Sequence, residues 1–209
     1  MARTSNTADR RAQIVDALIA VMAKQGYDGA SIADVARKAG LASGLVHYHF
    51  ESKHEILLEA VRVLAANHER ALDSALATCR DPVAELAAFI DVHLGLGAHA
   101  DPAALACWVL VMAEAIRDKR VRGEVETVLA RQAGRVAEIL RRGNDAKQFA
   151  CEDLEAAAAA IVATIQGYFS VAATARSVIP AGSAAGSAAR MIAALVGARP
   201  PLAHKRGSR

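Results

Sequence analysis

The chain has 209 residues, of which 54% are hydrophobic and 4% aromatic, and its formal net charge is +3. A core of Ala, Leu, Ile and Val without strictly alternating runs favours packed helices over sheets, so an all-α fold is predicted. The cysteines Cys79, Cys107 and Cys151 form no C-x-x-C pair, which argues against a disulfide framework and for a cytoplasmic protein. The polar opening residues lead us to expect no signal peptide.

The first predicted element is a helix over residues 8–25, preceded by a flexible arm at residues 1–7. Its apolar residues recur at helical spacing, and the two glycines of "QGYDG" (25–29) are expected to end it. The apolar stripe consists of Ile14, Leu18, Val21 and Met22.

Two short helices follow. Ser31 and Asp34 have the spacing of a capping box, which starts a second helix that Gly40 ends. A third helix is predicted at about 43–49.

A longer helix is predicted next, from residue 53 to about 78. Ser52 and Glu55 form a second capping-box pattern at its start.

The rest of the chain is predicted to be longer helices with short connections. Asp81-Pro82 and Asp101-Pro102 each fit a helix N-cap followed by a first-turn proline, and Asp153 fits a further N-cap. The sequence after residue 196 has four Lys/Arg and no acidic residue, so 197–209 is predicted to be a basic, disordered tail. The expected helices cover roughly 82–98, 102–117, 121–142 (ended by Gly143-Asn144), 153–176 and 186–196.

The segment 156–175 has no charged residue over twenty positions, which raises the question of a membrane span. Most of it is alanine, and polar residues interrupt it, so a buried helix is favoured and no membrane partner is expected.

Residues 31–49 have the pattern of a helix–turn–helix, whose second helix enters the major groove of DNA. The stretch "GASIADVARKAGLASGLVHYHFESKHEILLEAV" (29–61) resembles the DNA-binding domain of the tetracycline-repressor (TetR) family. The resemblance implies a three-helix DNA-binding domain at 8–70, joined by the long helix to a larger ligand-binding and dimerisation domain at 71–196. The later part "WVLVMAEAIRDKRVRGEVETVLARQAGRVAEILRRG" resembles the BetI-type branch of that family.

The resemblance also implies roles for single residues. The opening of the second helix would contact phosphates or a base, the third helix would face the bases, and its end would contact the backbone or brace the helix. These DNA-binding candidates are Ser31, Ile32, Ala33, Ser43, Gly44, Leu45, His47, Tyr48, His49 and Lys53.

Lys53 also has a physical argument of its own. A cation in the first turn of a helix opposes the helix dipole by ~0.3–1 kcal/mol. A bound phosphate would reverse this effect, because helix N-termini attract anions. A lysine that points into water is the alternative.

His47 and His49 first suggest a metal site, but helical geometry argues against it. Residues two apart point roughly 200° apart on a helix and cannot share one ion. If His47 faces a phosphate or a base acceptor, DNA binding should strengthen between about pH 7.5 and 6.

In the rear domain, the resemblance implies a small-molecule pocket and a dimer interface. The ligand candidates are polar or aromatic residues on apolar helices, although core packing explains each of them as well. Choline is not carried over, since a cation–aromatic cage needs several aromatic side chains. The ligand candidates are Phe89, His93, Trp108, Met112, Glu114 and Gln166, and a small-residue stripe for dimer contact is Ala160, Thr164, Gly167 and Val171.

The sequence therefore predicts a ligand-responsive regulator of transcription and not an enzyme. It would be a repressor that binds a palindromic operator in double-stranded DNA as a homodimer and is released by a small molecule. No catalytic residue, metal or cofactor is expected, because no catalytic or nucleotide-binding motif occurs. A helical interaction protein or metal-binding protein without DNA binding is the alternative.

Overall fold

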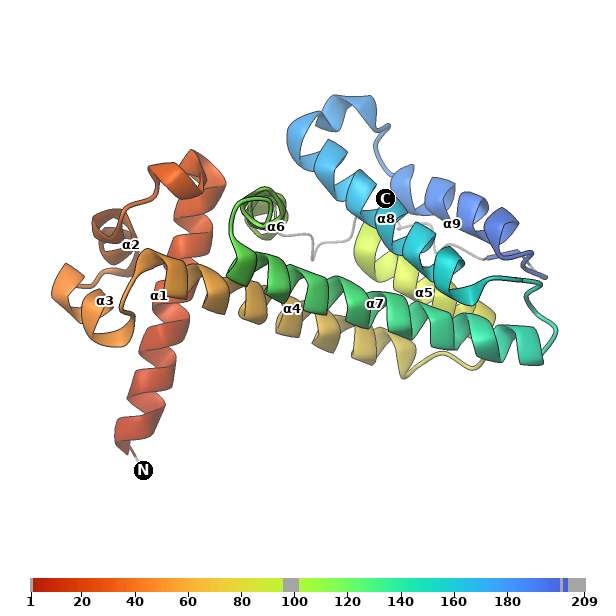
Figure 1. Cartoon of the computed structure of the whole chain (residues 1–209), viewed down its shortest axis with the longest axis horizontal. Helices are drawn as coiled ribbons and strands as arrows, with labels where there is room; N and C mark the ends of the chain where they lie inside the picture. Colours follow the sequence, from red (N-terminus) through yellow and green to blue (C-terminus); the bar gives the residue numbers. More distant parts are fainter. Residues whose placement is uncertain (1, 96–101, 200, 203–209) are drawn as a thin grey trace. The chain divides into compact units, whose positions relative to one another are not determined.

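The computed structural model describes residues 2–95, 102–199, 201 and 202, with side chains from residue 7 onward. Every regular element among these residues is helical, as predicted (Figure 1). The α-helices are α1 (Ala2–Gly29), α2 (Ile32–Ala39), α3 (Ser43–His49), α4 (Lys53–Leu76), α5 (Pro82–Leu94), α6 (Pro102–Glu114), α7 (Lys119–Asp145), α8 (Leu154–Thr174) and α9 (Ala184–Leu195), with a 3-10 turn η1 (Arg176–Val178).

The chain divides into two compact units. Unit 1 comprises residues 1–66 and 101–126, and unit 2 comprises residues 67–100 and 127–209. Helices α4 and α7 therefore each contribute residues to both units. The division differs from the domain boundaries expected from the sequence, because α6 and the start of α7 group with the helix–turn–helix.

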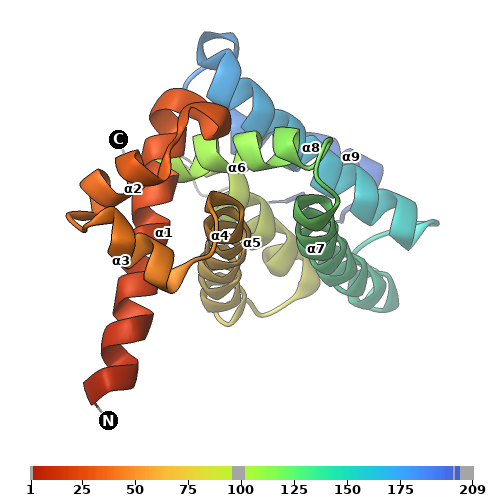
Figure 2. The ribbon, with the colours of Figure 1, turned by 60° about the vertical axis from the view of Figure 1, so that its left-hand side comes forward.

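Unit 1 is built around α1, which packs against α2, α3 and α6 (Figures 1 and 2). The predicted stripe of α1 is buried, and side chains from α2, α3 and α4 complete the core. Its fully buried large side chains include Ile14, Leu18, Met22, Phe50, Ile56 and Leu57.

Helix α1 begins at Ala2 and so includes the residues expected to form an arm. The apolar stripe that predicts the helix starts at Ile14 and carries no information about the polar residues before it. At the other end, Gly26 has a left-handed φ of 74°, and the helical path bends there. The predicted break therefore occurs at Gly26, and one more turn of α1 follows before the helix ends at Gly29.

Local capping signals place the next two helices. Ser31 and Asp34 form both hydrogen bonds of the predicted capping box, and Gly40 ends α2 with a left-handed φ of 66°. At the start of α4, the Glu55 N–H donates to Ser52 Oγ, but the Glu55 carboxylate accepts from the Glu51 N–H instead of that of Ser52. The second box is therefore half formed.

Unit 2 is held together by α5, α8 and α9, which pack against one another. Asp81 and Asp153 cap α5 and α8 as predicted, by accepting the N–H groups of Ala84 and Ala156. Asp101 lies outside the described residues. The core cluster includes Leu72, Leu86, Phe89, Ile90, Ile139, Leu140, Ile161, Ile165 and Ile192.

Gly143 does not break a helix, since α7 continues to Asp145. A Cβ at this position would lie 2.0 Å from an atom of the Phe149 ring. The glycine is therefore required for the close approach of that ring to the helix, a contact that the sequence pattern does not reveal.

Helix α8 contains the uncharged segment and is long and apolar enough to cross a membrane by length and composition alone. One face is buried as expected, by Ala157, Ala158, Ile161, Val162 and Ile165. However, just 28% of its most apolar window is buried. The prediction of a helix buried within the chain is thus right for one face of α8.

The described start of the tail is packed and not disordered. The Arg199 N–H donates to the Gln148 carbonyl at 2.7 Å, and Leu202 is buried. The prediction of disorder considered the charge of this segment, whereas the apolar side chain of Leu202 favours packing. Residues 203–209 lie outside the described part of the chain.

Candidate nucleic-acid interface

Helix α3 exposes one face and buries the other. Ser43, Gly44, Leu45, His47 and Tyr48 are exposed, and Tyr48 is the most exposed of the large apolar residues at 78%. Val46 and Phe50 are buried and anchor the helix to unit 1. The exposed face is the one that the sequence assigns to base contacts, and its polar groups are few.

Helix α2 packs against α3 in the helix–turn–helix. Ser31 and Ala33 are exposed, whereas Ile32 is half-buried. The Ser31 hydroxyl already serves as the N-cap of α2, accepting from the Asp34 N–H at 3.1 Å. The Ser31 hydroxyl and the Ser31 N–H in turn donate to the Asp34 carboxylate at 2.5 and 3.1 Å, and these two hydrogen bonds lower the pKa of the Asp34 carboxyl.

Arg11 on α1 braces the end of α3, a role that the sequence analysis missed. Its guanidinium donates to the His49 carbonyl at 2.6 Å and lies 4.0 Å from the centre of the Phe50 ring. Glu55 and Glu59 lie 3.7 and 3.8 Å from the same group. The His49 ring in turn makes an edge-on contact with Tyr48, with centroids 5.1 Å apart. The end of α3 is thus fixed by α1 and α4.

Lys53 is anchored and does not extend freely into water. Its ammonium donates to the carbonyls of Tyr27 and Ala30 at 2.7 and 2.8 Å and lies 4.2 Å from the centre of the Tyr27 ring. An ammonium has three N–H groups, so one remains for an external acceptor. The predicted phosphate contact would use this third donor.

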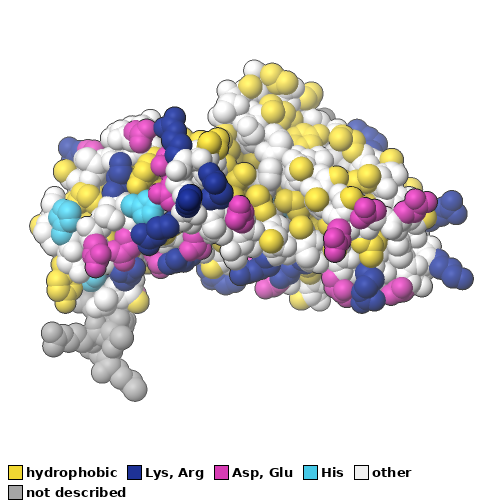
Figure 3. Space-filling view, in the orientation of Figure 1, with side chains coloured by type: hydrophobic (Ala, Val, Ile, Leu, Met, Phe, Trp, Pro, Cys, Tyr) yellow, Lys and Arg dark blue, Asp and Glu magenta, His cyan; other side chains and the backbone are white. Residues whose placement is uncertain are grey.

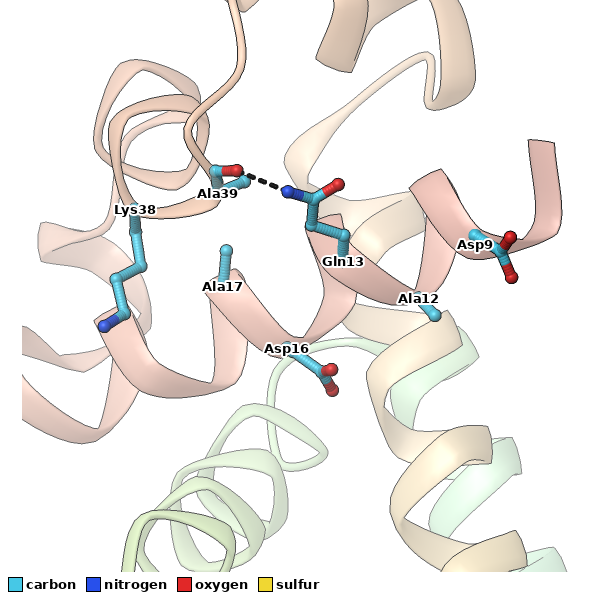
Figure 4. Close-up of a pocket in the computed structure, with 7 residues that line it drawn as sticks. All are labelled: Asp9, Ala12, Gln13, Asp16, Ala17, Lys38 and Ala39. Atoms are coloured by element: carbon cyan, nitrogen blue, oxygen red, sulfur yellow. Dashed lines mark hydrogen bonds between the residues drawn. The ribbon is translucent and has the colours of Figure 1, made fainter. Parts of the chain in front are cut away.

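A shallow hollow lies between α1 and the end of α2 (Figure 4). Gln13 closes one side by donating to the Ala39 carbonyl at 2.6 Å. Asp9 and Asp16 line the rest, with Lys38 opposite. The two carboxylates disfavour a phosphate, so the hollow is not part of the proposed DNA-binding surface.

Among the described residues, no group of three or more His, Cys, Asp or Glu side chains could hold a metal ion. His47 is exposed and His49 half-buried on the same short helix.

The predicted ligand residues fall into both units. Phe89, His93 and Gln166 belong to unit 2, whereas the sequence positions of Trp108, Met112 and Glu114 place those residues in unit 1. Phe89 and His93 are buried, and the other four are half-buried.

His93 is part of a buried pair with His68, which the sequence analysis did not assign to the site. The two Nε2 atoms are 2.8 Å apart, and His93 Nδ1 lies 2.7 Å from the Phe89 carbonyl. Burial, with the neighbouring His68, lowers the pKa of His93 to about 3. Burial also lowers the pKa of His68. Both rings are therefore neutral at physiological pH.

The predicted dimer stripe lies on the uncovered side of α8. Ala160 and Gly167 are exposed, Thr164 and Val171 are half-buried, and a Cβ on Gly167 would meet open space. Apolar side chains are spread over the surface where Figure 1 draws α8 (Figure 3). On α9, Met191 and Leu195 are 57% and 50% exposed, one helical turn apart.

Two family models match the chain. Residues 14–60 match "Bacterial regulatory proteins, tetR family", and residues 82–197 match "BetI-type transcriptional repressor, C-terminal". Two curated relatives are HTH-type transcriptional regulators BetI. The one from Agrobacterium fabrum is 31% identical over 113 residues, 54% of either chain. The one from Rhizobium meliloti is 30% identical over 113 residues, 54% of this chain and 55% of the relative. The match thus spans about half the length of these relatives.

Solved structures share the fold. A transcriptional regulator from Rhodococcus sp. has a TM-score of 0.78 at 22% identity, covering 88% of this chain and 95% of that one. A regulator from Saccharomonospora viridis, solved in complex with choline, has a TM-score of 0.78 at 22% identity, covering 94% of this chain and all of that one.

Proposed function

The chain belongs to the TetR family of bacterial regulatory proteins with a BetI-type C-terminal domain, and from this membership we propose that it is a DNA-binding repressor of transcription. It binds a palindromic operator as a homodimer in the cytoplasm, and a small molecule releases it. The family is one of regulators, which agrees with the expectation that the chain is not an enzyme.

The exposed face of α3 is the observation that carries the proposal. Leu45, His47 and Tyr48 are exposed on a helix that Val46, Phe50 and Arg11 fix in place. A large aromatic side chain at 78% exposure gains nothing for folding, whereas it would be covered in a DNA groove or against a sugar. With Leu45 limited to thymine methyl groups, base recognition would depend on Ser43 and His47.

Selection of bound duplexes from a random pool tests the proposal directly. We expect recovery of an inverted repeat whose half-sites are about 34–36 Å apart or a multiple of this, and binding that weakens steeply with salt. Tyr48→Ala should reduce affinity for the selected duplex about tenfold without lowering the melting temperature. Val178→Ala is the matched control, since Val178 is 70% exposed in unit 2. Salt-independent or undetectable binding would contradict the proposal.

Dimerisation is proposed to occur through α8 and α9. The uncovered stripe of α8 consists of small residues, which allow close helix approach, and Met191 and Leu195 extend the apolar surface on α9. Pairing with a second copy would cover all of them.

Release is proposed to follow from a small molecule bound in the C-terminal part. Helix α4 contributes residues to both units, so a ligand that shifts this helix would change the separation of the two recognition helices and weaken binding. Choline, the ligand of the similar S. viridis structure, is the first compound to titrate into the protein–duplex complex. Release would assign the effector to quaternary ammonium compounds, and unchanged affinity would exclude choline as inducer.

A further inference from the structure

His54, in the first turn of α4, makes an ion pair that the proposed DNA contacts do not explain. Its Nε2 lies 2.8 Å from Oδ2 of Asp118, which precedes α7. The side chains are 25% and 28% exposed. Both residues belong to unit 1, so the contact lies within one compact body.

Asp118 is held in a fixed frame. Its Oδ1 accepts from the N–H groups of Arg120 and Val121 at 2.8 and 3.0 Å, which caps α7. Arg122 donates to the carbonyls of Ala115 and Ile116 at 2.9 and 2.6 Å and so closes the end of α6. The remaining carboxylate oxygen, Oδ2, therefore reaches His54 from a rigid α6–α7 corner.

The pKa of Asp118 is lowered, first by the hydrogen bond from the Val121 N–H and also by His54. The carboxyl is consequently ionised at neutral pH and presents a negative charge to the His54 ring.

The same turn of α4 is held from a second direction by Lys53. Its two carbonyl acceptors, Tyr27 O and Ala30 O, lie at the end of α1. Burial, followed by the negative charges of Glu114 and Asp118, raises the pKa of the Tyr27 hydroxyl to about 12. The end of α6 and the residue that caps α7 therefore lie near the ring over which Lys53 stacks. The titratable and charged groups around this turn are Tyr27 and Asp28 from α1, Lys53 and Glu55 from α4, and Glu114 and Asp118 from the α6–α7 side.

We propose that His54 and Asp118 are positioning residues for DNA binding: their ion pair holds the first turn of α4, and with it the Lys53 ammonium, in place for a phosphate. The inference rests on the proposed function. Neither residue needs to touch DNA.

Two substitutions separate positioning from simple electrostatics. His54→Gln removes the imidazole that contacts Asp118, and weaker DNA binding by this variant alone would not separate the two explanations. Asp118→Asn removes a negative charge, which by charge alone would strengthen binding to a polyanion. Positioning predicts the opposite, a weakening. Asparagine is a good N-cap, so Asp118→Asn leaves α7 capped.

The experiment measures affinity for the selected duplex at one fixed pH, with the wild-type protein as the reference. We expect each single variant to bind about two- to five-fold more weakly than the wild type. The double variant should be no weaker than either single one, and in a Lys53→Ala background both substitutions should lose their effect. Melting temperatures measured alongside identify any variant that unfolds.

Tighter or unchanged binding by Asp118→Asn would overturn the inference, as would an undiminished effect of the substitutions in the Lys53→Ala background. A protein that binds no duplex with salt dependence would overturn the proposed function and this inference with it. Normal binding by the wild-type protein, together with unchanged affinity in both variants, would overturn the inference alone.

Discussion

At the scale of single residues, one arrangement of protons satisfies both hydrogen bonds of the His68–His93 pair. His93 Nδ1 donates to the Phe89 carbonyl, which leaves its Nε2 as an acceptor for the Nε2–H of His68. The His93 ring lies 4.3 Å from that of Phe89 and 6.3 Å from that of Phe169, measured between centroids. A proton added to His93 would have to displace this hydrogen bond in an apolar setting.

Unfolding stability should therefore fall as the pH drops below 6.5. The pKa of His93 is 6.5 in the unfolded chain and about 3 in the folded one, so between these values the unfolded state binds the extra proton. This one group removes up to about 1.4 kcal/mol per pH unit in that window and nothing above it. Thermal unfolding from pH 7.5 to 5 should show a shallower decline for His93→Gln than for the wild type.

His47→Gln serves as the control, because His47 is exposed on α3. Its melting curve should follow that of the wild type at every pH. Parallel declines for the wild type and His93→Gln would contradict the protonation argument.

Single-residue roles could be predicted from the sequence where the signal is local. Ser31 and Asp81 could be predicted as caps because each side-chain oxygen accepts from an N–H group just three positions further along the chain. Lys53 was identified as a first-turn cation, but its bonds to Tyr27 and Ala30 span 26 and 23 positions and leave no pattern. The same limit hid the bond from Arg11 to His49, 38 positions away.

At the scale of elements, α3 is too short to be stable alone and depends on its neighbours. Its C-terminal carbonyl at His49 is satisfied by Arg11, whose guanidinium also covers the Phe50 ring. The recognition helix is therefore positioned by a residue that precedes it by more than thirty positions.

Arg11→Ala should destabilise the fold by about 1–2 kcal/mol, through the lost charge-assisted hydrogen bond and the cation–π contact. Urea unfolding measures this loss. Affinity for the selected duplex should also fall, at a temperature where the variant remains folded. Arg10→Ala is the matched control, because Arg10 bonds Gln13 within α1. Equal effects of the two substitutions would argue against a special role for Arg11.

Periodicity predicts that these elements are helices. It predicts less well where each helix ends and which elements it packs against. Gly143 illustrates the limit. A single glycine looks the same in a sequence whether it ends a helix or leaves room for a neighbouring ring, as Gly143 does for Phe149. In α8, composition indicated an apolar helix and the small-residue stripe indicated a face for a second copy, but not that just 28% of the most apolar window would be buried. Both outcomes depend on packing between distant segments.

At the scale of the whole molecule, the uncovered faces of α8 and α9 determine the expected assembly. Met191→Asp combined with Leu195→Asp should leave the folded chain intact, since both side chains are about half exposed. Two carboxylates in an apolar interface should raise the dimer dissociation constant roughly 100-fold, about 3 kcal/mol. Light scattering at micromolar concentration should then report a monomer for the variant and a dimer for the wild type.

Ile116→Asp provides the comparison, because Ile116 is 75% exposed in unit 1, away from α8 and α9 in the sequence. It should remain dimeric. A monomeric wild type would refute the proposed interface.

The partly covered helix α8 also bears on how the protein is made. Synthesis delivers α1 to α7 to the ribosome exit before α8, so the helix–turn–helix can fold while the apolar segment is still inside the tunnel. The apolar surface of α8 then emerges late, and the proposed pairing with a second copy would cover it before it contacts a chaperone or an aggregate. Neighbouring ribosomes on one messenger RNA would supply that copy at high local concentration.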